Sequence, residues 1–283
     1  MKSRGTSIYG VDFTSAPRRA KPITVARLEA HDDGRYALVG LEALADWPAF
    51  DAFLVRPGPW VAGFDMPFGL PRELVETLGW PVEWRALIAH YAALDRATIR
   101  EIFVAFCDAR PAGSKFAHRA SDRPAGSSPS MKWVNPPVAW MLHAGAPRLI
   151  AAGVCIPGLD DDPSHIDVDR VALEAYPGYL ARSITRASYK SDTRSMQTPA
   201  RRGQRARIVD ALLSGHHAMS LAITIDEAQR AVLIDEGSAD RLDAVLCAVQ
   251  AAWALRQHGA GHPRYGLPET IDPLEGWIVG VPA

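Results

Sequence analysis

The sequence predicts an α/β protein whose mixed sheet is flanked by helices. Three segments near the start are rich in Val, Ile, Tyr and Leu, and the turn "HDDGR" joins the last two, which predicts an antiparallel meander. These segments are residues 6–13, 22–30 and 35–40. A short helix in "LADWPAF" and a fourth apolar strand, Trp60 to Asp65, come next. Because a helix precedes this fourth strand, we expect it to pair parallel to the first strand.

An insertion interrupts this pattern at about residues 72–168. Helical segments at 83–107 and 136–152 flank the loop "CDARPAGSKFAHRASDRPAGSSPS", which is dense in Gly, Pro and Ser. A long polar loop in a compact protein is usually either functional or disordered, and the sequence leaves both open. With 283 residues in the chain, we expect a single domain, 1–283, that carries this insertion.

The core resumes after the insertion. We predict a strand at Val171 to Tyr176, helices at about 178–186, 204–214 and 225–234, and a last strand in "EGWIVGV". The strongest helix begins near Ser238, an expected N-cap, and ends at Gly259. Apolar residues recur along it at three- and four-residue steps and predict a stripe that faces the sheet. They are Leu242, Val245, Leu246, Val249, Ala252 and Trp253.

Composition excludes several classes of protein. The chain is 48% hydrophobic and 22% charged with a net charge of -1, so global charge does not indicate a nucleic-acid partner. The three cysteines, Cys107, Cys155 and Cys247, are far apart and indicate neither a disulfide framework nor a thiolate metal site. We find neither a signal-peptide core nor an apolar segment long enough to span a bilayer. A cytoplasmic protein with no membrane role is therefore expected.

Acidic residues stand at the ends of three predicted strands. Asp12 ends "SIYGVD", Asp65 ends "WVAGFD", and Glu174 lies in "RVALEAYPG". One such acid is more often a turn former, but parallel strands bring their carboxyl ends to one edge, where open α/β sheets bind ligands. Asp243 lies within the apolar stripe of the last helix. The helix dipole explains Asp240, three residues earlier, better than it explains Asp243.

Carboxylates gathered at one edge repel one another, and some take up protons unless a cation lies among them. Hard oxygen ligands suit Mg²⁺ or Mn²⁺, and two such ions about 4 Å apart activate water and stabilise the leaving oxygen in phosphodiester hydrolysis. We therefore predict metal ligands at Asp12, Asp65, Glu174, Asp240 and Asp243. The predicted catalytic residues are Asp12, Asp65, Glu174, Asp243 and Lys190.

Basic residues are concentrated in loops 110–132 and 182–207. They are Arg110, Lys115, His118, Arg119, Arg123 and Lys132 in the first, and Arg182, Arg186, Lys190, Arg194, Arg201, Arg202, Arg205 and Arg207 in the second. Solvated loops are the commoner explanation of such clusters. In a chain of near-zero net charge, however, they imply acid elsewhere, as expected when phosphate binds one face. Lys190, in "SYKSD", is expected to contact phosphate or water, and a nucleic acid or nucleotide is the expected partner.

An ordered set of motifs resembles a known family. "GVDFTSA", "GFDMPFGLP", "EAYPG", "YK" and "DRLDAVLCAVQAAW", followed by "EGWIVG", resemble the domain-of-unknown-function family number 429, described as predicted nucleases with a ribonuclease H-like fold. The resemblance covers nearly the whole chain. It implies a five-stranded ribonuclease H-like sheet with helices on both sides. It also implies an acidic site at Asp12, Asp65, Glu174 and Asp243, with Asp240 beside it.

Three functions therefore stay open. The preferred one is a metal-dependent phosphodiesterase or nuclease. Actin-like ATPases and sugar kinases use a related sheet, but "DFTSA" lacks the Gly that lets backbone approach a phosphate. The third is a non-catalytic module that binds a nucleic acid or partner through the basic loops. The chain has no G-x-S-x-G, H-E-x-x-H or G-x-x-x-x-G-K-[ST] motif, so other hydrolase and nucleotide-binding classes lack support.

Overall fold

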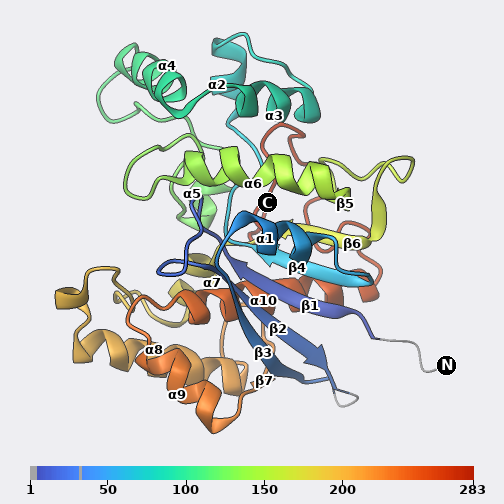
Figure 1. The fold of residues 1–283 in the computed structure, drawn as a ribbon, viewed down its shortest axis with the longest axis vertical. Coiled ribbons are helices and arrows are strands. Elements are labelled where there is room, and N and C mark those ends of the chain that lie inside the picture. The colour runs from blue at the N-terminus through green and yellow to red at the C-terminus, as the bar shows by residue number, and fades with distance from the viewer. Residues whose placement is uncertain (1–4, 32–33) are drawn as a thin grey trace.

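Two helical layers enclose one mixed sheet in the computed structural model, which describes residues 5–31 and 34–283 (Figure 1). Seven strands of the described chain form this sheet, in the order β5-β6-β4-β1-β2-β3-β7. They are β1 (Ser7–Asp12), β2 (Ile23–Ala30), β3 (Tyr36–Leu44), β4 (Trp60–Phe64), β5 (Val154–Cys155), β6 (Asp167–Glu174) and β7 (Ile223–Thr224). The α/β class and the mixed sheet are confirmed.

Strand directions agree with the sequence prediction at the centre of the sheet. Strands β1, β2 and β3 form the antiparallel meander, and β4 pairs parallel to β1. Strand β6 continues the parallel part beside β4. The expected count of five strands is wrong for the described residues, because the two-residue strands β5 and β7 add one pairing at each edge. The turn predicted in "HDDGR" includes residues 32–33, which lie outside the described residues.

The predicted strand in "EGWIVGV" is wrong. This segment is irregular, and its two glycines, Gly276 and Gly280, have φ angles of 69° and 82°, which an extended strand does not allow. It instead crosses the end of β6, where the Val279 N–H donates to the Glu174 carbonyl over 2.9 Å. The carboxyl-terminal segment therefore covers the edge of the sheet near Glu174.

One helical layer comes from α1 and the insertion. Its helices are α1 (Trp47–Leu54), α2 (Arg72–Thr77), α3 (Trp84–Ala93), α4 (Arg96–Asp108), α5 (Asp122–Ala125) and α6 (Val138–Ala152) (Figure 1). The predicted helical segment 83–107 is two helices, because the Asp95 side chain caps α4 by accepting the Thr98 N–H. Apolar residues of α3, α4 and α6 share one core with Val11 and Phe64 of the sheet. The insertion thus packs directly on this face.

The opposite layer consists of α7 (Pro177–Ile184), α8 (Pro199–Ser214), α9 (Glu227–Asp235) and α10 (Asp240–Gly259), with a short 3₁₀ helix at Arg194–Met196. Helix α8 begins earlier than predicted because Thr198 caps it. Ser238 is not the N-cap of α10. Ala239 holds that position with a φ of 62° and no side-chain cap. None of the described helices combines the length and apolar character needed to cross a bilayer.

Helix α10 meets the sheet backbone to backbone. A Cβ atom on Gly10 of β1 would lie 2.0 Å from the Ala244 carbonyl oxygen and 2.0 Å from the Ala248 nitrogen. A Cβ on Gly63 of β4 would lie 2.6 Å from the Cys247 carbonyl oxygen. Only glycine permits this approach. It sets the start of α10 against β1 and β4, close to the ends where Asp12 and Asp65 stand.

Candidate functional site

The backbone brings Asp12 and Asp65 side by side. In the parallel register Val11 pairs with Phe64, and the Asp65 N–H donates to the Val11 carbonyl over 2.8 Å. The two acids therefore occupy equivalent positions at the ends of neighbouring strands, and both are partly buried. The prediction that these two share one edge of the sheet is confirmed.

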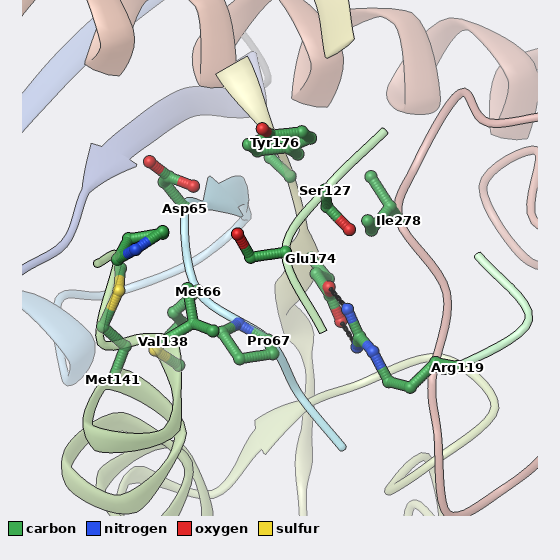
Figure 2. A pocket seen from close by; sticks show the side chains of 13 residues that line it. Asp65, Met66, Pro67, Arg119, Ser127, Val138, Met141, Glu174, Tyr176 and Ile278 are labelled. Atoms are coloured by element: carbon green, nitrogen blue, oxygen red, sulfur yellow. Dashed lines mark hydrogen bonds and ion pairs between the residues drawn. The ribbon is translucent and has the colours of Figure 1, made fainter. Parts of the chain in front are cut away.

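Glu174 reaches the same edge but faces the other layer. It pairs with Phe64, one residue before Asp65, and side chains alternate between the two faces of a sheet. Glu174 consequently points toward the layer of α1 to α6, whereas Asp12 and Asp65 point toward the layer of α10. Figure 2 shows the Glu174 side chain directed at Arg119 and away from Asp65. Glu174 therefore points away from the other acids, although its charge still raises the pKa of Asp65 and both residues line one hollow.

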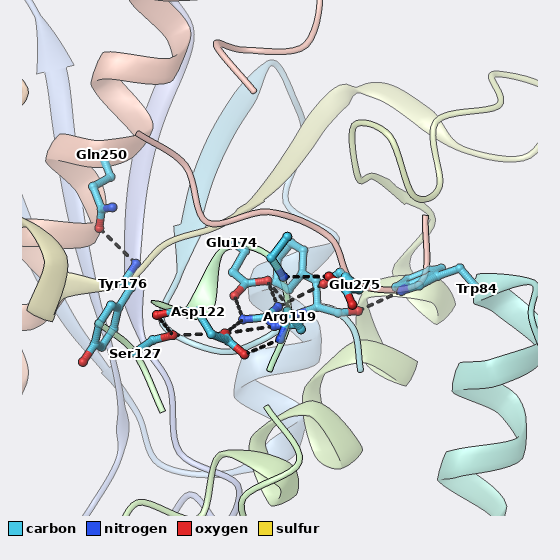
Figure 3. A network of polar contacts seen from close by, with 10 residues as sticks. Trp84, Arg119, Asp122, Ser127, Glu174, Tyr176, Gln250 and Glu275 are labelled. Atoms are coloured by element: carbon cyan, nitrogen blue, oxygen red, sulfur yellow. Dashed lines mark hydrogen bonds and ion pairs between the residues drawn. The ribbon is translucent and has the colours of Figure 1, made fainter. Parts of the chain in front are cut away.

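Arg119, from the polar loop of the insertion, binds Glu174 (Figure 3). Its guanidinium donates to both Glu174 oxygens over 2.6 and 2.7 Å, to Asp122 Oδ1 over 2.9 and 3.1 Å, and to the Glu275 carbonyl over 3.0 Å. The Phe68 N–H also donates to Glu174, over 2.9 Å. Burial raises the pKa of Glu174, and the positive charge of Arg119 opposes that rise. This cluster is fully bonded and joins the insertion loop to the sheet.

Asp243 lies on the same side as Asp12 and Asp65, at the start of α10, and is 0% exposed. The Tyr189 hydroxyl donates to Asp243 Oδ1 over 2.6 Å, and the Lys190 ammonium donates to Oδ2. Burial alone lowers the pKa of Lys190, but the negative charge of Asp243, followed by Tyr189, Asp65 and Asp12, raises it well above its usual range. The Lys190 ammonium therefore stays protonated beside the three acids.

Asp240 stands apart from this group. Its carboxylate accepts from Lys21 Nζ over 2.8 Å, and the same ammonium contacts Asp192 over 3.0 Å. Asp240 still acts on Asp12 through its charge, since it is among the groups that raise the pKa of Asp12. We therefore place Asp240 at the rim of the acidic group.

The environment of Asp12 and Asp65 disfavours the negatively charged form of both side chains. Burial raises the pKa of Asp12 well above its usual range, and the charges of Asp243 and Asp65 raise it further. Burial raises the pKa of Asp65 to about 7. The positive charge of Lys190 opposes this rise, and the negative charge of Asp243 adds to it. Within residues 5–31 and 34–283, neither carboxylate has a hydrogen-bond or ion-pair partner. These oxygens are available to a ligand.

The donor chemistry of the acids fits a divalent cation, because carboxylate oxygens are the ligands that Mg²⁺ and Mn²⁺ prefer. The geometry is incomplete: across the described residues, no three His, Cys, Asp or Glu side chains are grouped closely enough to hold a metal ion. Tyr189 and Lys190 occupy the oxygens of Asp243, and Arg119 occupies those of Glu174. Asp12 and Asp65 could bind a cation directly, and Asp243 could join them once Lys190 releases it.

Three hollows meet at these residues. The first, of about 280 Å³, has a mixed polar and apolar lining that includes Asp65, Tyr176, Arg186 and Lys190. The second, of about 360 Å³, is lined by Asp12, Lys190 and the hydroxyl residues that follow Asp12. The third is mainly apolar and contains Asp65, Tyr176 and two methionines (Figure 2). Solvent and ligands can therefore reach the acids from both sides of Lys190.

Some basic residues of the two loops are bound within the protein, and others are free to contact a ligand. Arg119 is buried against Glu174, and Arg205 is buried with its donors on the Ile234 and Tyr189 carbonyls, both over 2.7 Å. Arg182 lies over the Tyr176 ring at 5.1 Å. Arg186 has no hydrogen bond or ion pair to the described chain and lines the first hollow. It is an available cation four residues before Lys190 that lines the same hollow.

Two contacts of the acids were not predicted. Tyr189 donates to Asp243, and its position beside Lys190 in "SYKSD" was the only available signal. Arg119 neutralises Glu174, but nothing in the sequence distinguishes it from the other basic residues of its loop. Both contacts join residues more than 50 positions apart, which local patterns cannot reveal.

No protein-family model, no curated protein and no solved structure matches the chain.

Proposed function

We propose that this protein is a metal-dependent phosphodiesterase or nuclease that uses Mg²⁺ or Mn²⁺ on a ribonuclease H-like sheet. The observation that carries the proposal is the pair Asp12 and Asp65, two adjacent carboxylates with raised pKa and no partner in the described chain, beside Asp243 and Lys190. A cation would relieve their mutual repulsion.

The fold part of the proposal draws on two observations. The sheet joins an antiparallel meander to parallel strands and carries helices on both faces, as the resemblance to family 429 implies. The motifs that carry the resemblance also contain the residues of the acidic group, from "GVDFTSA" to "DRLDAVLCAVQAAW". Strand arrangement and motif order therefore support the same family.

Each residue of the group has a distinct role in this proposal. Asp12 and Asp65 would bind the cation, and Asp243 would complete the set. A bound Mg²⁺ or Mn²⁺ ion would polarise the phosphoester and activate water. Lys190 and Arg186 would hold phosphate oxygens in the first hollow, which both side chains line. Glu174, predicted as a further ligand, has both oxygens bound by Arg119, and in this arrangement its role is to fix the insertion loop.

The test is Mn²⁺-dependent hydrolysis of bis(p-nitrophenyl) phosphate and of DNA and RNA oligonucleotides. We expect Asp12→Asn and Asp65→Asn to lower the rate by about 100-fold or more, because changes to outer partners of a metal site alone commonly cost 10- to 100-fold. Asp235→Asn is the matched control, since Asp235 is exposed, pairs with exposed Arg202 and lines none of the three hollows at the acids.

Calorimetric titration with Mn²⁺ is the companion measurement. The wild type and Asp235→Asn should bind the ion, and Asp12→Asn should not. Hydrolysis that persists in EDTA, or that survives both Asp12→Asn and Asp65→Asn, would reject the proposed function.

A further inference from the structure

Lys190 lies where a cation among the acids is expected. Its ammonium donates to Asp243 Oδ2, while the other Asp243 oxygen accepts the Tyr189 hydroxyl over 2.6 Å. The Lys190 side chain is 44% exposed, whereas that of Asp243 is 0% exposed. A side chain that begins near solvent thus carries a positive charge to a buried carboxylate.

The backbone around Lys190 is fixed more firmly than its side chain. Arg205, itself buried, donates to the Tyr189 carbonyl over 2.7 Å. The Ser191 N–H donates to the Gly237 carbonyl over 3.0 Å. Beyond its ion pair with Asp243, the ammonium lies 5.8 Å from the Tyr189 ring and is attracted by the charges of Asp65 and Asp12, to which it makes no hydrogen bond in the described chain. Lys190 can therefore leave Asp243 by side-chain rotation, without movement of the loop.

Two cations cannot use Asp243 at once without strong repulsion. While the ammonium of Lys190 is present, a divalent ion at Asp12 and Asp65 meets an added positive charge and lacks the third carboxylate. The first hollow, of about 280 Å³, offers the ammonium another position, because Lys190 lines it together with Arg186 and Ser188. A phosphate in this hollow would attract Lys190 away from Asp243.

We propose that Lys190 is a resident counter-ion that keeps a divalent metal from Asp243 until a phosphodiester in the adjacent hollow draws it away, so that metal and substrate bind cooperatively. This inference rests on the proposed function and adds a control to it. The coupling is reciprocal, so the phosphodiester must strengthen metal binding by the same factor as the metal strengthens phosphodiester binding.

The experiment measures Mn²⁺ affinity by calorimetry, with and without dimethyl phosphate, a small phosphodiester. Lys190→Gln keeps a hydrogen-bond donor for Asp243 and removes the charge. We expect it to bind Mn²⁺ about tenfold or more tightly than the wild type, within the range usual for coupled sites, and to lose the effect of dimethyl phosphate. Lys190→Arg keeps the charge and should show no gain.

Lys21→Met is the matched control, because Lys21 is a second ammonium near the acids that binds Asp240 and not Asp243. Its effect on Mn²⁺ affinity should be much smaller than that of Lys190→Gln. Circular dichroism establishes that each variant is folded. The wild type supplies an independent test, since dimethyl phosphate should strengthen its Mn²⁺ binding whether or not Lys190→Gln folds.

The outcomes separate the two proposals. Mn²⁺ binding that Asp12→Asn abolishes, but that neither Lys190→Gln nor dimethyl phosphate strengthens, would overturn the role of Lys190 and leave the proposed function intact. Absence of Mn²⁺ binding in the wild type and in Lys190→Gln, with and without dimethyl phosphate, would overturn both.

Discussion

Two cation–carboxylate pairs stand at the same edge of the sheet and differ in how they are held. Arg119 binds Glu174 through a planar guanidinium whose donors also reach Asp122 and the Glu275 carbonyl. Lys190 binds Asp243 through a single ammonium on a flexible stem. The basic side chain is 2% exposed in the first pair and 44% exposed in the second.

The difference separates a structural ion pair from an exchangeable one. A buried guanidinium with several bonded partners can leave only if the surrounding loop unfolds, because each partner would lose its hydrogen bonds. An ammonium with one strong partner and a route to solvent can leave by rotation. Burial of a carboxylate alone therefore does not identify a functional acid, and the freedom of its counter-ion must be considered too.

The strongest way to break this comparison is Arg119→Met. The change leaves Glu174 and Asp122 buried without their cation, and we expect a loss of about 3–5 kcal/mol in the free energy of unfolding. Urea denaturation monitored by tryptophan fluorescence measures it. Arg202→Met, which removes an ion pair exposed on both sides, is the control and should cost about 1 kcal/mol or less. Equal losses in the two variants would contradict the structural role of Arg119.

A second, smaller effect concerns the pH dependence of stability. Asp65 has a pKa raised from 3.8 to about 7 in the folded protein, so between these values the folded state binds more protons than the unfolded chain. Asp65 therefore makes stability fall as pH rises from about 4 to 7, after which the effect is complete. The shift corresponds to about 4 kcal/mol for a fully buried group. Because Asp65 is only partly buried, solvent screening reduces the expected total to the order of 2 kcal/mol. Asp65→Asn should remove this part of the slope.

Urea denaturation in EDTA between pH 4 and pH 8 measures that slope. Asp192→Asn serves as the control, since the Asp192 side chain is 80% exposed. A wild type and an Asp65→Asn variant with the same pH slope would show that Asp65 ionises normally in the folded state.

The smallest effect is expected from Tyr189→Phe, which sharpens the description of the exchangeable pair. The change removes one hydrogen bond to the buried Asp243 carboxylate and keeps the ring, so unfolding should become easier by about 1.5 kcal/mol. Denaturation measures this loss, and Tyr179→Phe, whose hydroxyl donates to the Gly280 carbonyl, provides a matched comparison. No loss in Tyr189→Phe would mean that water replaces the hydroxyl at Asp243.

Local patterns predict the positions of the acids but not their partners. The apolar runs before Asp12 and Asp65 predict strand ends, and the parallel pairing that aligns them is confirmed. The apolar stripe around Asp243 predicts its burial, which is also confirmed. The face that Glu174 occupies depends on register between strands more than 100 residues apart in sequence, and a shift of one residue would reverse it.

The polar insertion loop shows the same limit. Its Gly, Pro and Ser content is compatible with either a disordered or a functional loop. Neither interpretation predicts that Arg119 is buried, with 3% of the whole residue exposed. That burial arises only when the loop meets Glu174 and the carboxyl-terminal segment. Likewise, the two-residue strands β5 and β7 are too short to leave a periodic pattern, so the sequence predicts a narrower sheet.

The glycine contacts between α10 and the sheet have a further consequence for the acids. Because peptide groups touch directly at Gly10 and Gly63, the distance of Asp243 from Asp12 and Asp65 is determined by main-chain thickness and not by the size of any apolar side chain. Substitutions elsewhere in the core can change its filling without altering that spacing. A single methyl group at either glycine would push the helix outward. Asp243 would then move away from Asp12 and Asp65, although none of the three acids is itself substituted.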